Sequence, residues 1–195
     1  MEMSLSHKTG RARGFSLMEV MVAVFILAFG MLALAWSMNQ LSTTTSQSRS
    51  SGVEVLLASE KLEDLNRYGA SDPLLAASPS TSLTSDTAGY YDQIQISSGK
   101  DLNNAGDIIE TTIGSSGGTA NYTQIKHSPN GAISVTTTTG TPPASTADML
   151  VFDRRWLIEK DVPLAGVHRV TVWVQLQNAP NGASAVPFQT SMVRP

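Results

Sequence analysis

Cysteine is absent from the 195-residue sequence. Disulfide bonds, thiol catalysis and Cys-ligated zinc are therefore excluded. Histidine is scarce as well, because His7, His127 and His168 stand alone and offer neither metal-ligand spacing nor a catalytic triad. No glycine-rich phosphate loop follows an apolar strand pattern. The sequence therefore predicts a protein without enzymatic activity, bound metal or cofactor.

Charge is also sparse. Charged residues make up 15% of the sequence, and the formal net charge is −3 at pH 7. A chain with this balance lacks the excess positive charge that draws proteins to nucleic acid. We therefore predict no nucleic-acid partner, and the length suits one folded domain plus an anchor.

Proline is missing between Phe15 and Pro73. This permits one long helix over residues 15–68, interrupted only by Gly30 and Gly52, that would span roughly 80 Å at 1.5 Å per residue. The middle of this stretch, residues 41–51, consists mostly of Ser and Thr, which are poor helix formers. We expect the helix to bend or fray there.

A short basic tail precedes the first part of this helix. Lys8, Arg11 and Arg13 come just before an apolar run over residues 20–36, which is long enough to cross a bilayer core. Glu19 is the one ionisable residue at the start of this run. A carboxylate inside a membrane helix is costly, so its default interpretation is functional.

The segment Gly14-Phe15-Ser16-Leu17-Met18-Glu19, with the basic tail before it and the apolar run after it, resembles a type IV prepilin. The resemblance implies cleavage by prepilin peptidase between Gly14 and Phe15, methylation of the new amino terminus at Phe15, and an assembly contact through Glu19. It also implies two further partners, the other pilin subunits and the inner-membrane assembly platform. The protein would be stored in the inner membrane with a cytoplasmic N-terminus, then enter a surface pilus or a periplasmic pseudopilus.

The chemistry of the same residues supports this interpretation. An α-amine has a pKa of about 8, so a chain that began at Phe15 would carry a charge at the head of an apolar helix. Glu19 of one subunit could neutralise the Phe15 amine of its neighbour. Removing one partner of a buried ion pair typically costs about 3–5 kcal/mol, so this contact could set the register of a helix bundle.

Two other interpretations of the apolar run stay open. One is an ordinary membrane anchor with an incidental glutamate near its cytoplasmic edge. The other is a secretory signal peptide, because Ala33-Leu34-Ala35 provides an A-x-A site at the end of the run. Glu19 and the length of the run count against the signal peptide.

The chain divides into four predicted segments: a cytoplasmic leader at 1–14, a transmembrane or filament-core helix at 15–36, a helix continuation at 37–69, and an exported β-rich head at 70–195. Removing a leader of net charge +2 would shift the net charge of the chain from −3 to −5. Many pilins close a C-terminal loop with a disulfide. This sequence departs from that pattern, so packing alone must hold its last loop.

Helical periodicity returns after the polar middle. Val55, Ala58, Leu62 and Leu65 share one helix face, and Gly69 is a plausible end. We expect this face to pack on the head, and four charged residues to turn mostly away from it: Glu60, Lys61, Glu63 and Asp64. Residues 58–65 resemble the corresponding part of minor pilins and pseudopilins.

The sequence of the head predicts strands joined by turns. Candidate strands cover residues 90–96, 108–113, 122–126, 133–139, 150–158, 167–177 and 186–193, with turns at 129–131, 163–166 and 178–183. Val170, Val172, Val174 and Leu176 share one strand face that we expect to lie against the helix. The fold class is therefore α+β, a long N-terminal helix packed against a C-terminal antiparallel sheet, as in type IV pilins. Residues 152–156 and 170–174 resemble the minor pilin family called PilV.

Three polar motifs in the head do not indicate a metal site, a modification or catalysis. Asp101, Asn103 and Asp107 open a calcium loop, but Thr112 stands where a bidentate glutamate is expected. Asn121 begins a glycosylation sequon that has little weight in a prokaryotic setting. We expect strand-face salt bridges, rather than an acid–base pair, from Asp153, Arg154, Arg155 and Asp161.

Together these features predict a minor type IV pilin. A minor pseudopilin of a type II secretion or DNA-uptake system would have the same N-terminus. A single-pass anchored envelope domain that binds a ligand without polymerising is the alternative from a different class.

Overall fold

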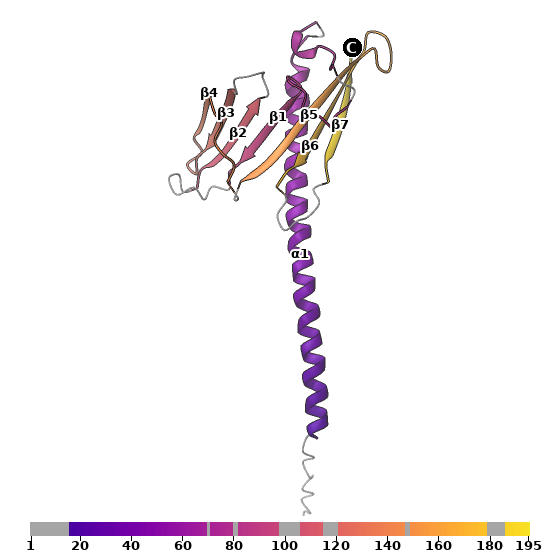
Figure 1. The fold of residues 1–195 in the computed structure, drawn as a ribbon, viewed down its shortest axis with the longest axis vertical. Helices are drawn as coiled ribbons and strands as arrows, with labels where there is room; N and C mark the ends of the chain where they lie inside the picture. The colour runs from indigo at the N-terminus through magenta and orange to yellow at the C-terminus, as the bar shows by residue number, and fades with distance from the viewer. Residues whose placement is uncertain are drawn as a thin grey trace, which may run out of the picture. The chain divides into compact units, whose positions relative to one another are not determined.

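A computed structural model describes residues 16–69, 71–79, 82–97, 106–114, 121–146, 149–178 and 186–195. In these residues one long helix, α1, precedes seven strands (Figure 1). Their bounds are α1 Leu17–Asn66, the 3-10 turn η1 Pro73–Leu75, β1 Tyr91–Ile96, β2 Ile108–Gly114, β3 Asn121–His127, β4 Ile133–Thr139, β5 Leu150–Lys160, β6 His168–Leu176 and β7 Phe188–Arg194. The seven predicted strands are thus confirmed, each to within two residues at both ends.

Helix α1 runs through the polar middle without a break. The hydroxyl groups of Thr43 and Thr44 donate to the carbonyl oxygen of Gln40, and that of Ser50 donates to Gln47. The side chains thereby bond back within the helix that they were expected to weaken. The predicted fraying over residues 41–51 is therefore wrong.

The chain forms two compact units, residues 1–44 and 45–195. The described part of the first unit is the apolar stretch of α1, and residues 16–42 are all exposed. The second unit contains the rest of α1 and the sheet, and we call it the head.

The head contains a single antiparallel sheet with the strand order β4-β3-β2-β1-β5-β6-β7. Strands β1 to β4 form a meander in one direction, and β5 to β7 form a second meander in the other. The chain returns from the β4 edge to place β5 beside β1, with Ile94 opposite Phe152. The last three strands thus form the predicted meander packed on the helix, but the pairing of β1 with β5 was not predicted.

One face of the sheet meets α1 and carries the core. Val170, Val172 and Val174 are fully buried, and Leu176 is 3% exposed, as the strand alternation predicts. They pack with residues of β1, β5 and the helix in a cluster completed by Leu57, Ala58, Leu65, Leu75, Ile94, Phe152, Trp156 and Ile158. The fold is therefore α+β with a pilin-like arrangement of helix and sheet.

The packed face of α1 differs in part from its prediction. Ala58 and Leu65 are buried and Leu62 is partly buried, but Val55 is 42% exposed and Leu57 takes its place in the core. Lys61, expected to turn away, has a side chain only 14% exposed. The interface therefore lies farther around the helix than the apolar spacing alone indicates.

Two predicted turns are confirmed by their hydrogen bonds. Between β3 and β4, the Ser128 amide donates to Ala132, and Gly131 has a φ of 83°. Between β5 and β6, the Val162 amide donates to Val167, and Gly166 has a φ of 82°. Glycine suits both positions because it adopts positive φ without steric cost. The predicted turn at 178–183 lies mostly outside the described residues.

Candidate functional site

The beginning of α1 carries the predicted site. The Ser16 carbonyl oxygen accepts hydrogen bonds from the amides of Glu19 and Val20, at 2.9 and 3.2 Å. Glu19 is therefore an acidic residue in the first helical turn, where the helix dipole favours negative charge. Gly14 and Phe15 lie outside the described residues, as does His7.

The surroundings of Glu19 are apolar. The helix surface on one side of it is formed by Met18, Val22, Ala23 and Ile26. Glu19 is exposed, and none of the described residues forms an ion pair with it. A carboxylate on an apolar helix needs a counter-charge once water is removed. The described residues do not provide one, so Glu19 is available to a charged group outside them.

The apolar part of α1 continues from there as an uncovered surface. Among the described residues, α1 is the one helix long and apolar enough to cross a membrane, and its most apolar window has a mean hydropathy of 2.5 with no residue buried. Side chains such as Phe25, Leu32 and Trp36 are 58%, 69% and 68% exposed. Such a surface is stable only in lipid or against other helices. A signal sequence can be equally long and apolar, so the residues before the run must distinguish a membrane anchor from a signal sequence.

Within the head, polar contacts fasten the second half of α1 to the sheet. The guanidinium of Arg154, on β5, donates to both carboxylate oxygens of Asp92, on β1, at 2.9 Å each, and to the carbonyl oxygen of Leu57 at 3.1 Å. Burial disfavours its charge, but hydrogen bonding and attraction to Asp92 outweigh burial and raise the pKa of Arg154. The sequence predicted a salt bridge for Arg154 but did not identify Asp92 as its partner.

Lys61 and Glu54 are further ionisable side chains on the helix face toward the sheet. The Lys61 ammonium lies 3.9 Å from the centre of the Trp156 ring and 4.0 Å from Asp92. Burial lowers the pKa of Lys61, and Asp92 opposes that effect. Glu54 is 2% exposed and accepts a hydrogen bond from the Leu176 amide. Burial raises its pKa, and this hydrogen bond partly offsets the rise.

The last strand also contacts the helix. Arg194, at the end of β7, donates to the carbonyl oxygens of Leu65 and Tyr68, at 2.9 and 2.6 Å. Leu65 lies in the last turn of α1, where carbonyl oxygens need partners outside the helix, and Tyr68 follows just after the helix. The C-terminal strand is therefore held to the end of the helix by hydrogen bonds as well as by packing. The last loop, expected to be held by packing alone, lies mostly outside the described residues.

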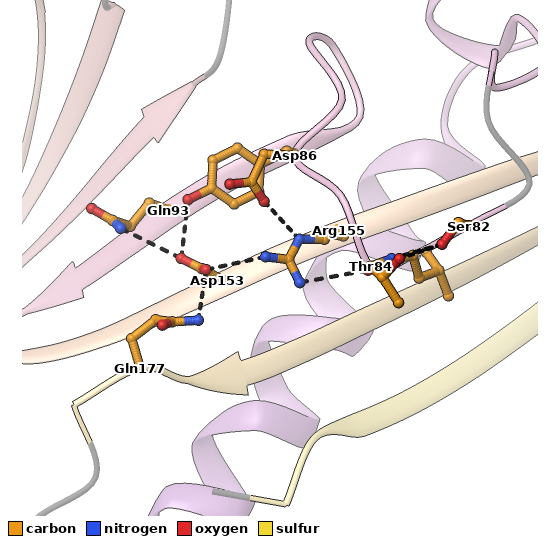
Figure 2. A network of polar contacts seen from close by, with 9 residues as sticks. Ser82, Thr84, Asp86, Gln93, Asp153, Arg155 and Gln177 are labelled. Carbon is orange, nitrogen blue, oxygen red and sulfur yellow. Dashed lines mark hydrogen bonds and ion pairs between the residues drawn. The ribbon is translucent and has the colours of Figure 1, made fainter.

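The opposite face of the sheet carries a second polar network, drawn in Figure 2. Asp153 is 6% exposed and accepts hydrogen bonds from Tyr91, Gln93, Arg155 and Gln177 at 3.0, 3.4, 3.4 and 2.7 Å. Burial, and then the Asp153 charge, raise the pKa of Tyr91.

Arg155 continues this network to the segment before β1. Its guanidinium donates to Asp86 at 2.8 Å and to the Leu83 carbonyl oxygen at 3.5 Å, and it lies 4.5 Å from the Trp173 ring centre. The network therefore ties residues 83–86 to the sheet. This confirms the predicted salt bridge of Asp153 and Arg155. Asp161 instead closes a turn, because its carboxylate accepts from the Gly166 amide.

The remaining candidate residues that the structure describes do not come together in one site. His127 ends β3 and His168 begins β6, and no group of three potential metal ligands occurs in the described part of the chain. Asp101 and Asn103 lie outside it, while Asp107 forms an ion pair with Lys126 at 2.6 Å. The side chain of Asn121, at the start of β3, accepts a hydrogen bond from Thr139.

Comparison with known proteins identifies the N-terminal stretch. Residues 9–35 match the family model described as the prokaryotic N-terminal methylation motif. No curated protein and no solved structure matches the chain. The chain thus carries a type IV prepilin-like N-terminal signal, which implies processing by a prepilin peptidase and assembly with other pilins. The signal and the apolar helix fit anchoring in the inner membrane before assembly.

Proposed function

We propose that this protein is a minor type IV pilin, a structural subunit that takes part in the assembly or the tip of a pilus. The matched motif over residues 9–35 carries the proposal, because it joins a basic leader, Gly14-Phe15, Glu19 and an apolar run in one stretch. The head supports it with a sheet packed on the second half of the same helix. The resemblance of residues 152–156 and 170–174 to PilV suggests the subgroup.

Processing divides the chain at one bond. Prepilin peptidase cleaves between Gly14 and Phe15, removing the leader 1–14, and the new amino terminus of Phe15 is methylated. Residues 15–36 then hold the subunit in the inner membrane and later form part of the filament core. The head is exported and reaches the cell surface with the pilus.

Glu19 is the assembly contact. Its carboxylate lies in the first turn of α1 among apolar side chains and pairs with the Phe15 amine of a neighbouring subunit. Because apolar helices gain little hydrophobic energy on moving from lipid to a helix bundle, such an ion pair and close packing determine which register forms. A minor pseudopilin would use the same chemistry inside the periplasm.

The test replaces Glu19 by alanine in the native host. Glu19→Ala should leave expression and membrane insertion intact and reduce incorporation into sheared filaments. Glu63→Ala, an equal charge change at an exposed position on the same helix, is the matched control. Normal incorporation of the Glu19 variant would contradict the assigned role.

A further inference from the structure

The sheet of the head has two open edges. In the strand order, β4 stands at one end and β7 at the other, and each pairs with one neighbour among the described residues. Figure 1 shows them on opposite sides of the sheet. Both strands are seven residues long. Each edge therefore presents a row of backbone donors and acceptors that another strand can use.

Strand β4 has none of the usual features that prevent pairing. Its sequence, Ile-Ser-Val-Thr-Thr-Thr-Thr, contains no charge and no proline. Ile133 and Val135 are 65% and 64% exposed, and both are β-branched. Native sheets normally protect a long edge with lysine, proline or a bulge, so an unprotected edge of this kind indicates a binding surface.

The side chains of β4 alternate between the two faces of the sheet. Ile94 of the core lies opposite Thr112, which lies opposite Thr123, which lies opposite Thr137. Directly opposed residues share a sheet face, so Ile133 and Val135 lie on the face that carries α1.

The side chains of β7 alternate between the same two faces of the sheet. On the α1 face it presents Thr190 together with Phe188 and Met192, which pack against the core. On the other face it presents Gln189, Ser191 and Val193, which is 57% exposed. Strand β4 likewise presents Ser134 and Thr136 on the other face. Joining the two strands with Ile133 beside Phe188 would place the β-branched Val135 beside Thr190, and the polar Ser134 and Thr136 beside Gln189 and Ser191. Thr137 would then stand beside Met192, and Thr138 beside Val193. A shift of one residue would lose this match, so the pairing has a preferred register.

The direction of the strands determines how two copies of the chain can be joined. Every neighbouring pair in the sheet is antiparallel, so β4 and β7, six steps apart, run in the same direction. A copy that extends the sheet therefore forms a parallel β4–β7 pair in which Ile133 aligns with Phe188. This contact uses different surfaces on the two copies, so it can propagate beyond a dimer.

We propose that the β4 edge of one copy of this chain pairs with the β7 edge of a second copy in the same membrane. This pairing rests on the proposed function only in requiring that the two copies share one membrane. Cleavage at Gly14 and the role of Glu19 are measured separately, so either proposal can fail alone.

The absence of cysteine allows a direct test in the full-length chain. Thr136→Cys and Ser191→Cys are introduced together on the polar faces of the two edges, and native membranes are treated with a short bis-maleimide cross-linker. The expected result is a ladder of dimers and larger products. Leu164→Cys with Ser191→Cys, which places the first thiol at a 70% exposed position in the β5–β6 turn, should remain monomeric.

Three outcomes would overturn the proposal. Monomers only would exclude the contact, and products with a different protein would exclude a second copy as the occupant. Equal dimer formation by Thr136→Cys alone would indicate β4–β4 pairing instead. Adding Val135→Lys should abolish the ladder, while Leu74→Lys, at another exposed apolar position, should leave it unchanged. Circular dichroism of the purified variants checks that the head stays folded.

Discussion

Removing the carboxylate of Asp92 should destabilise the head severely. Asp92 and Arg154 have side chains only 6% exposed, and two hydrogen bonds of 2.9 Å join them. The same guanidinium donates to the Leu57 carbonyl oxygen, so the pair connects β1, β5 and α1. Asp92→Ala would leave the Arg154 charge buried without its main partner, and Lys61 would lose a neighbouring carboxylate as well.

The expected magnitude follows from burial. Breaking a buried ion pair by removing one partner costs about 3–5 kcal/mol, because the remaining charge stays desolvated. That is a large part of the roughly 5–15 kcal/mol that stabilises a typical domain. Replacing both partners by apolar residues, as in Asp92→Leu with Arg154→Met, should cost less than either single change, because neither member of the pair is then left buried without the other.

Urea denaturation of the full-length protein in detergent, followed by circular dichroism, measures these differences. Glu159→Ala is the matched control. Its ion pair with Arg169 is also formed between neighbouring strands, but the two side chains are 23% and 43% exposed and remain in contact with solvent, so the denaturation midpoint should move far less than for Asp92→Ala. A loss below about 1 kcal/mol for Asp92→Ala, or a double variant whose loss equals the sum of the two single losses, would refute this reasoning.

Two further changes test the contacts between helix and sheet. Burial raises the pKa of Glu54, so the folded state binds more protons than the unfolded state between the ordinary carboxyl pKa and the raised one, and wild-type stability should fall as pH rises through that window. Glu54→Gln keeps the acceptor oxygen, and its stability relative to wild type should increase over the same window in urea titrations; a constant difference would contradict the assignment. Arg194→Ala should cost about 1–3 kcal/mol, because it removes charged hydrogen bonds to the carbonyl oxygens of Leu65 and Tyr68. Amide exchange near the end of α1 should accelerate, whereas Arg67→Ala, an equal charge change at an exposed site, should have little effect, and equal effects of the two would contradict the capping role.

The elements of the head could be predicted because their signals are local. Strand β4 and its turn were located by alternation and by Asn130-Gly131, and the valines of β6 identified the face toward the helix. Position 55 was misassigned because helical spacing alone does not determine the centre of a buried face. The helix was also expected to fray at its Ser- and Thr-rich middle, where hydroxyl groups instead bond back to the helix.

Sequence patterns could not predict the contacts between residues that lie far apart in the chain. Asp92 and Arg154 are 62 residues apart, and they meet because β1 pairs with β5, which does not follow it directly in the chain. Lys61 and Glu54 were missed for another reason. A pattern that divides residues only into apolar and polar places charged side chains in solvent. Against the sheet, however, Lys61 contacts the Trp156 ring and the Asp92 carboxylate, and Glu54 accepts a hydrogen bond from the Leu176 amide.

The candidate site at the N-terminus is the opposite case. Its residues are consecutive in the sequence, so the motif could be identified without a fold, and the family model matches the same stretch. The structure adds the helical first turn at Glu19 and its apolar surroundings. The partner of Glu19 belongs to another subunit in our proposal, so neither the sequence nor the fold of one chain contains it.

Intact mass and N-terminal sequencing of the protein purified from its native membrane address the proposed processing without any substitution. We predict a chain that begins at Phe15 and carries one added methyl group. A chain that retains residues 1–14, or one that begins at Trp36 after the Ala33-Leu34-Ala35 site, would contradict pilin-type processing and the role assigned to Glu19.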